Sequence, residues 1–126
     1  MKRITTLLAA AALALAVSVP AVLAKGGDGT RIVLKPARAF PAAKGSAQFK
    51  AKAGERQLEV EVEHVRRLAG KRVTFFVGGQ KIGSAKIGAL GTAQIERRNS
   101  SAPAVSAGTA VSVKTAGGTL IVRGSF

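Results

Sequence analysis

The chain lacks several residue types on which catalytic and metal sites depend. It has no cysteine, tryptophan or tyrosine, one histidine, His64, and one aspartate, Asp28. The absence of thiols excludes disulfides, thiol nucleophiles and cysteine-ligated metals. A general base needs a nucleophile or an orienting group beside it, and the sequence shows no triad or nucleophile-elbow pattern. We therefore expect no catalytic residues, no metal site and no cofactor.

Acidic residues are also scarce. Six of them stand against 20 lysines and arginines, which gives a formal net charge of +14. Small domains stay soluble with a net charge of about 2 to 8, so the excess favours an anionic partner, such as a polysaccharide or a cell-envelope polymer. Nucleic-acid binders place exposed aromatic rings among their basic residues. Phe76 is the one candidate ring, which disfavours nucleic acid. The alternative is that the charge serves only solubility.

The first 24 residues have the order of a secretory signal peptide. Lys2 and Arg3 precede an apolar run, and the segment ends at Ala24 after Val22-Leu23. A membrane span needs about 20 continuous apolar residues, and this run is shorter. We expect residues 1–24 to be a signal peptide that is cleaved after Ala24, and the protein to be secreted or periplasmic with no transmembrane span. The remaining chain carries 18 basic and six acidic residues, a net charge of +12.

Apolar and polar residues alternate over most of the mature chain, the pattern of half-buried β-strands. Residues 25–44 would form a lead-in with the first strand and a connection rich in proline and alanine, and residues 45–126 the main body of one domain. The fold class that this predicts is all-β, a single small antiparallel β-sandwich, with a partly closed barrel as the alternative. The expected strands cover residues 30–35, 45–52, 56–65, 71–77, 80–87, 92–97, 110–116 and 119–126.

Three glycine-containing turns predict how neighbouring strands pair. Gly54-Glu55, Gly78-Gly79 and Gly117-Gly118 each suit a two-residue hairpin turn. These turns would place opposite each other Ala51 and Leu58, Phe49 and Val60, Ala47 and Val62, Lys50 and Glu59, Gln48 and Glu61, Phe75 and Ile82, Phe76 and Lys81, Val113 and Val122, and Val111 and Gly124. The residues that we expect to be buried are Phe49, Leu58, Val60, Val62, Val73, Phe75, Ile82, Ile95, Val111, Val113, Leu120 and Val122.

Several short stretches between Ala47 and Phe126 carry a family resemblance. They are Leu58-Glu59-Val60-Glu61-Val62, Leu68-Ala69-Gly70, Val77-Gly78-Gly79, Ile82-Gly83-Ser84-Ala85, Gly91-Thr92-Ala93, Gly108-Thr109-Ala110-Val111 and the ending Gly124-Ser125-Phe126. Together they resemble small exported bacterial β-sandwich proteins of uncharacterised function. The resemblance implies the fold, and it implies no catalytic or binding residues because its motifs are turn glycines and core alternation.

Two sets of residues are candidates for a site of chemistry. Glu59, Glu61 and Glu63 alternate on one strand at roughly 6.5–7 Å, near the spacing of acid pairs in glycoside hydrolysis, which makes a carboxylate-dependent hydrolase one alternative. A solvated acidic face explains these glutamates more simply. His64 follows them in the phase of the buried residues, which predicts a partly buried strand end.

The basic residues gather around two connections. Four of them are the candidate polyanion-binding site: Arg66, Arg67, Lys71 and Arg72. Arg97 and Arg98 begin a second loop, which strand alternation places at the opposite end of the domain. We expect an exported, non-catalytic binding or structural module that docks on an anionic polymer through its basic loops. A protein-interaction module that uses a sheet edge is the alternative.

Overall fold

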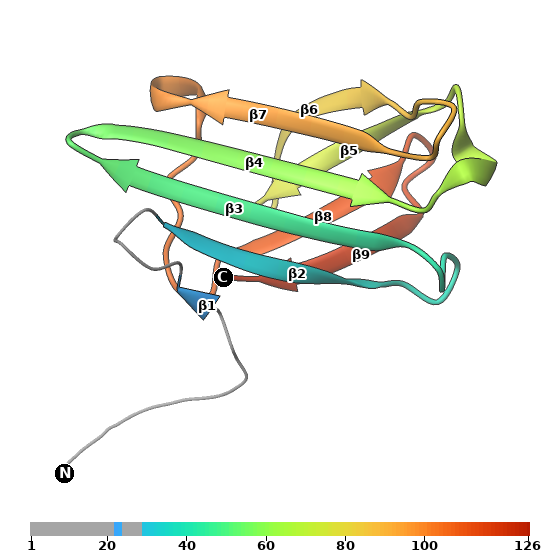
Figure 1. The fold of residues 1–126 in the computed structure, drawn as a ribbon, viewed down its shortest axis with the longest axis horizontal. Helices are drawn as coiled ribbons and strands as arrows, with labels where there is room; N and C mark the ends of the chain where they lie inside the picture. The colour runs from blue at the N-terminus through green and yellow to red at the C-terminus, as the bar shows by residue number, and fades with distance from the viewer. Residues whose placement is uncertain (1–21, 24–28) are drawn as a thin grey trace, which may run out of the picture.

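The computed structural model describes residues 22–23 and 29–126 (Figure 1). The predicted signal peptide therefore lies almost wholly outside the described residues. The strands are β1 (Val22–Leu23), β2 (Thr30–Pro36), β3 (Lys44–Lys52), β4 (Glu55–Glu63), β5 (Arg72–Val77), β6 (Gln80–Lys86), β7 (Ala93–Arg98), β8 (Ala110–Thr115) and β9 (Leu120–Ser125). Two short 3₁₀ turns are η2 (Arg66–Leu68) and η3 (Asn99–Ser101).

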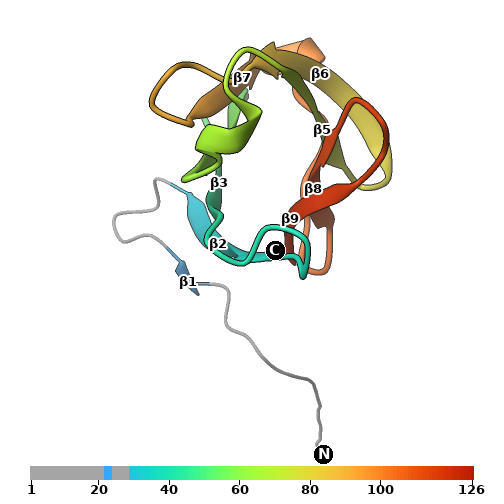
Figure 2. The same cartoon turned by 90° about the vertical axis from the view of Figure 1, so that its right-hand side faces the viewer.

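The strands β2 to β9 form one antiparallel sheet in the order β6-β5-β8-β9-β2-β3-β4-β7, and β1 pairs with β2 outside this order. The predicted all-β class with eight antiparallel strands is confirmed. The halves β2-β3-β4-β7 and β6-β5-β8-β9 face each other across the core, as sandwich layers do (Figure 2). Strand β2 pairs with β3 and, at Lys35 and Pro36, with β9. This junction joins the halves into a nearly closed barrel.

Side chains cover the seam where the two ends of the sheet meet. Strands β6 and β7 end the sheet order and are not hydrogen-bonded to each other as strands. Instead, the Arg97 Nε donates a hydrogen bond to the Ile82 carbonyl oxygen at 3.0 Å. Gly83 makes room for this contact, because a Cβ there would lie 2.3 Å from both Ile95 Cδ1 and Arg97 Nη2. A guanidinium thus satisfies an edge carbonyl that a neighbouring strand would otherwise bond.

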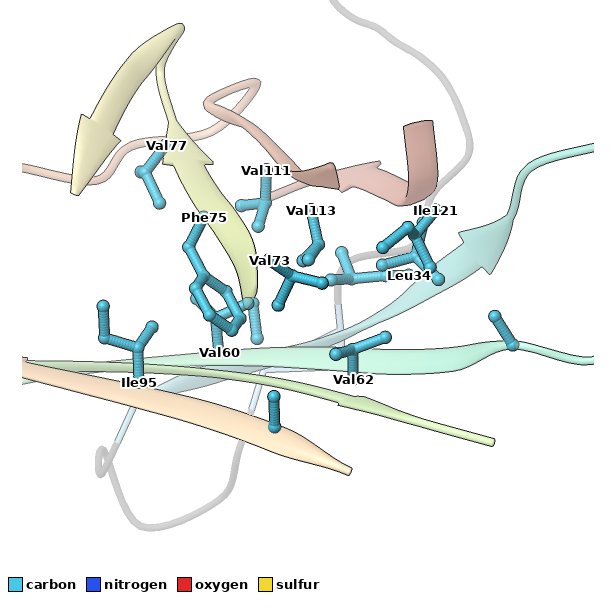
Figure 3. Close-up of a cluster of buried hydrophobic side chains, with 14 of the residues drawn as sticks. Leu34, Val60, Val62, Val73, Phe75, Val77, Ile95, Val111, Val113 and Ile121 are labelled. Carbon is cyan, nitrogen blue, oxygen red and sulfur yellow. The ribbon is translucent and has the colours of Figure 1, made fainter. Parts of the chain in front are cut away.

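The core is built from the inward residues of both halves. Figure 3 shows Phe75 of β5 reaching toward Val60 and Ile95 on the facing half. Nine of the twelve residues expected in the core are buried, and Phe49, Ile82 and Leu120 are half-buried instead. Phe75 is fully buried whereas Phe76 is half-exposed, so the predicted inner face of β5 is confirmed.

Two predicted registers needed correction. The β3–β4 turn is Ala53-Gly54, with φ of +54° and +83°, so Phe49 lies opposite Leu58, Ala47 opposite Val60, Ala51 opposite Arg56, Lys50 opposite Gln57 and Gln48 opposite Glu59. The pairing predicted from Gly54-Glu55 was off by two residues, which preserves the faces because side chains alternate with a period of two. In β5–β6, Phe76 and Lys81 are paired as expected, but a bulge places Gly83 opposite Phe75 in place of Ile82.

The third hairpin follows its prediction and then departs from it. Val113 lies opposite Val122 and Val111 opposite Gly124, as expected. Beyond them the register shifts, since Lys114 pairs with Leu120. The extra residue, Ile121, is fully buried and Leu120 is only half-buried. The bulge therefore exchanged one predicted core residue for its neighbour.

We predict that Phe75→Ala lowers the free energy of unfolding by about 3–5 kcal/mol, the usual cost of removing a buried ring. Urea unfolding followed by circular dichroism measures it. Phe76→Ala is the matched control on the outer face and should cost clearly less. Equal losses for the two variants would contradict the assignment of the inner face.

Candidate functional site at the basic end of the barrel

The loops that follow β2, β4, β6 and β8 lie at one end of the barrel, on the right in Figure 1 and facing the viewer in Figure 2. We call this the basic end. Its exposed cations are Lys35, Arg38, Lys44, Arg66, Arg67, Lys71, Arg72 and Lys86. Within the described residues, Glu63 is the carboxylate that accompanies them, in the position opposite Lys44. One end of a small domain therefore holds a strong excess of positive charge.

The β4–β5 connection holds its cations on a rigid turn. Val65 is buried and Leu68 half-buried, so both sides of η2 are fixed to the core. The Gly70 N–H donates to the Ile87 carbonyl oxygen at 2.8 Å, and the Ile87 N–H donates to the Lys71 carbonyl oxygen at 2.8 Å. These bonds attach the connection to the neighbouring β6–β7 loop. Arg66 and Lys71 therefore project from an ordered backbone and lose little backbone entropy on binding.

Gly91 lies beneath Arg66 and fixes how closely the two loops approach. It is buried with a φ of +80°, and a Cβ there would lie 2.6 Å from the Arg66 backbone nitrogen. The Val65 N–H also donates to the Gly91 carbonyl oxygen at 3.1 Å. Any larger residue at this position must push the η2 turn outward.

We predict that Gly91→Ala lowers the free energy of unfolding by about 1–3 kcal/mol through backbone strain and the clash with Arg66. Gly79→Ala is the matched control, because Gly79 has a φ of +79° and open space around its Cβ position. Urea unfolding of both variants separates the strain of a positive φ, which both share, from the clash with Arg66, which only Gly91→Ala has. A cost no larger for Gly91→Ala than for Gly79→Ala would contradict the close packing beneath Arg66.

The structure divides the four predicted site residues into two pairs. The Arg67 guanidinium lies 4.4 Å from the centre of the Phe40 ring and donates to the Ala39 carbonyl oxygen. Arg72 donates to the Ser84 hydroxyl at 3.4 Å. Both therefore have intramolecular partners, and Arg67 ties the β4–β5 connection to the β2–β3 loop. Arg66 and Lys71 are exposed and are the members best placed to meet a ligand.

Sequence reasoning missed the contribution of the β2–β3 loop. Lys35, Arg38 and Lys44 lie at the same end as Arg66, although the two loops are distant in sequence. The signal was present, because alternating strand directions place the loops after the first and third predicted strands together. Strand direction was used in the prediction only to place the loop that begins with Arg97 and Arg98. These two do lie at the opposite end, where β7 ends (Figure 1).

His64 departs from its expected partial burial. Strand β4 ends at Glu63, and His64 has a φ of +64° and an exposed side chain. This left-handed residue turns the chain so that Val65 enters the core in its place. The His64 Nε2 lies 3.7 Å from the Glu63 carboxylate. The histidine thus lies at the rim of the basic end, in open solvent.

The five glutamates of the described residues share the outer face of β4 and β7. Glu59 of β4 lies directly opposite Glu96 of β7, and such like-charge pairs are unfavourable. Glutamines relieve the repulsion along the diagonals, because Gln94 donates to the Glu59 carboxylate and Gln57 donates to Glu96. The stripe lies on an open strand face, which favours the solvated acidic surface over a cleft between paired acids.

Glu61 carries an unfavourable charge within this stripe. Partial burial raises the pKa of Glu61 above its ordinary value, and the neighbouring charges of Glu63 and Glu59 raise it further, while Arg31 acts in the opposite direction. Because the folded-state pKa is raised, ionised Glu61 destabilises the fold above that pKa. The penalty disappears as the pH falls below the unfolded value of about 4.3.

We predict that Glu61→Gln raises the free energy of unfolding by about 0.2–1 kcal/mol at pH 7, the scale of cross-strand charge effects. The gain should shrink as the pH falls toward 4 and vanish near pH 3, where the wild-type carboxyl is protonated in both the folded and the unfolded state. Urea unfolding across this pH range measures it. Glu55→Gln is the control, because Glu55 lies opposite Lys52 and should lose a favourable pair. A gain that is independent of pH would contradict the raised pKa.

Neither a metal site nor a membrane-crossing helix is found in the part of the chain that the structure describes. No three His, Cys, Asp or Glu side chains there are grouped to hold an ion. None of its helical turns has the length and apolar character that crossing a bilayer requires. In comparisons with known proteins, no family model, no curated protein and no solved structure matches the chain. Function must therefore be inferred from the surface itself.

Proposed function

We propose that this protein is an exported, non-catalytic binding module that docks on an anionic polymer of the cell envelope or the extracellular space through its basic end. The observation that carries the proposal is the collection of eight exposed cations and one carboxylate at this end. Binding to a polymer gains from many such ion pairs acting together, because each one releases condensed counterions.

The shape of the basic end supports a broad, charged ligand. Its cations come from three separate connections, with Arg38 on β2–β3, Arg66 and Lys71 on β4–β5, and Lys86 where β6 ends. Such a spread suits a chain of repeated negative groups better than a single small ion. Its side chains are exposed and its β4–β5 backbone is pinned, so the surface is formed before the ligand arrives.

Strand addition at a sheet edge is the second candidate. Strands β6 and β7 each have one hydrogen-bonded strand neighbour in the sheet order, which leaves edges that a partner strand recognises in other proteins. However, the Arg97 side chain already bonds the Ile82 carbonyl at this seam. A partner would have to displace it, and its complex would survive high salt. The charge-based proposal needs no such rearrangement.

We predict that the protein binds a heparin column and needs substantial salt for elution, because several ion pairs must break together. Reversing two exposed cations, in the double variant Arg66→Glu and Lys71→Glu, should move elution to clearly lower salt. The slope of log affinity against log salt should fall by about one for each ion pair that the substitutions remove. Elution of the wild type at very low salt would contradict the proposal.

The matched control separates a site from mere net charge. Lys81→Glu with Arg31→Glu makes the same charge change at exposed positions near the starts of β6 and β2, away from the basic end. Its elution should shift much less than that of the basic-end variant. Equal shifts for the two double variants would show that the total charge, and not the basic end, is responsible.

A further inference from the structure

A small pocket lies at the end of the barrel opposite the basic end, beside the β3–β4 turn and η3. Its volume is about 140 Å³. The residues that line it are Lys50, Lys52, Glu55, Arg56, Gln57, Arg98 and Asn99. Four of these are cations and one is an anion, so the pocket is electropositive.

Strand pairing fixes one wall of this pocket. Lys50 lies opposite Gln57, and Gln57 lies opposite Arg98, so these three residues form a row across β3, β4 and β7. Lys52 lies further out along β3, opposite Glu55. Arg98 already forms an ion pair, because its guanidinium lies 2.8 Å from the Glu96 carboxylate. Among the described residues, no carboxylate oxygen lies within 4.0 Å of the Lys50 or Lys52 ammonium group, although Lys52 faces Glu55 across the strand pair.

The opposite wall is built by Arg56 and Asn99. The Asn99 Oδ1 accepts a hydrogen bond from the Arg56 N–H at 3.2 Å, so its amide nitrogen is left as a donor. The Arg56 Nε donates to the Ala102 carbonyl oxygen at 2.9 Å, which leaves the terminal guanidinium nitrogens for a ligand. Asn99 adopts a φ of +52°, a conformation that costs energy for a residue with a side chain.

The backbone around Asn99 holds this conformation in place. The Ala102 N–H donates to the Asn99 carbonyl oxygen at 2.9 Å, and Ser101 Oγ both accepts from the Arg98 N–H and donates to its carbonyl oxygen. The Asn99 amide therefore stands on a fixed turn, and the Arg56 guanidinium of β4 is bonded to the end of that turn at the Ala102 carbonyl oxygen. Hydrogen-bond donors from the lysines of β3 and from Arg56 and Asn99 therefore line the pocket from two different segments of the chain. The space between them is large enough for a group of five heavy atoms.

We propose that this pocket binds one tetrahedral oxyanion, a phosphate or sulfate group, either free or carried as an ester on a sugar. A tetrahedral anion offers acceptor oxygens to both walls at once, and charge-assisted hydrogen bonds from lysine and arginine are the strong class. The Glu55 carboxylate, which also lines the pocket, repels additional negative charge and so disfavours a ligand with more than one phosphate or sulfate group. The proposal does not depend on the basic end, since the two surfaces share no residue.

The test is an NMR titration of the ¹⁵N-labelled protein with inorganic phosphate, inorganic sulfate and acetate at constant ionic strength. Phosphate or sulfate should shift the amide signals of Arg56, Gln57 and Asn99 along a saturable curve. The double variant Lys50→Gln and Lys52→Gln should weaken the affinity at least tenfold, and its spectrum reports in the same experiment that it is folded. A heparin-derived disaccharide as a fourth probe shows whether the free or the sugar-bound group binds more tightly.

The control is Lys81→Gln with Arg123→Gln, which removes the same charge elsewhere and should change the affinity less than twofold. The proposal is overturned if the shifts do not saturate, if acetate binds as tightly as phosphate and sulfate, or if the control loses as much affinity as the lysine pair. The variant Arg66→Glu with Lys71→Glu should leave this titration unchanged. Failure of this site and failure of the basic end are thus separate results.

Discussion

The barrel depends on the close contact between its two halves at Leu34 of β2. Here a single strand pairs with β3 on one side and reaches β9 on the other. Two glycines allow the approach, because a Cβ on Gly45 would lie 3.1 Å from the Leu34 Cβ and one on Gly124 would lie 2.9 Å from its Cδ2. Leu34 itself is 1% exposed. Without these two small residues the halves would separate, and the four loops of the basic end would no longer be held together.

Much of the fold could be predicted because strand alternation and glycine turns are local signals. The eight strands β2 to β9 all begin and end within two residues of their predicted limits. The predicted strand registers that were wrong depended on the backbone conformation of single residues. Ala53 takes a left-handed conformation that alanine rarely adopts. The turn is therefore Ala53-Gly54, and the β3–β4 register differs from the predicted one. The bulge at Ile121 likewise leaves no compositional trace, since Leu120 and Ile121 are equally apolar.

The candidate site was predictable in part for a different reason. Arg66, Arg67, Lys71 and Arg72 are close in sequence, so their clustering needs no tertiary information. The participation of Arg38 and Lys44 requires strand direction, and the engagement of Arg67 by Phe40 requires the packing of two loops. The pocket beside η3 was the hardest to foresee, because it joins residues of a hairpin and a turn that are 43 positions apart in sequence.

The acidic stripe has a consequence for how the molecule moves. All five described glutamates lie on the outer face of β4 and β7, whereas the cations gather mostly at the ends. The protein therefore carries a permanent electric dipole in addition to its net charge. A negatively charged surface exerts a torque on such a dipole within roughly a Debye length, about 8–10 Å at moderate salt. The molecule would rotate as it approaches, so that its glutamate face turns away before any contact forms.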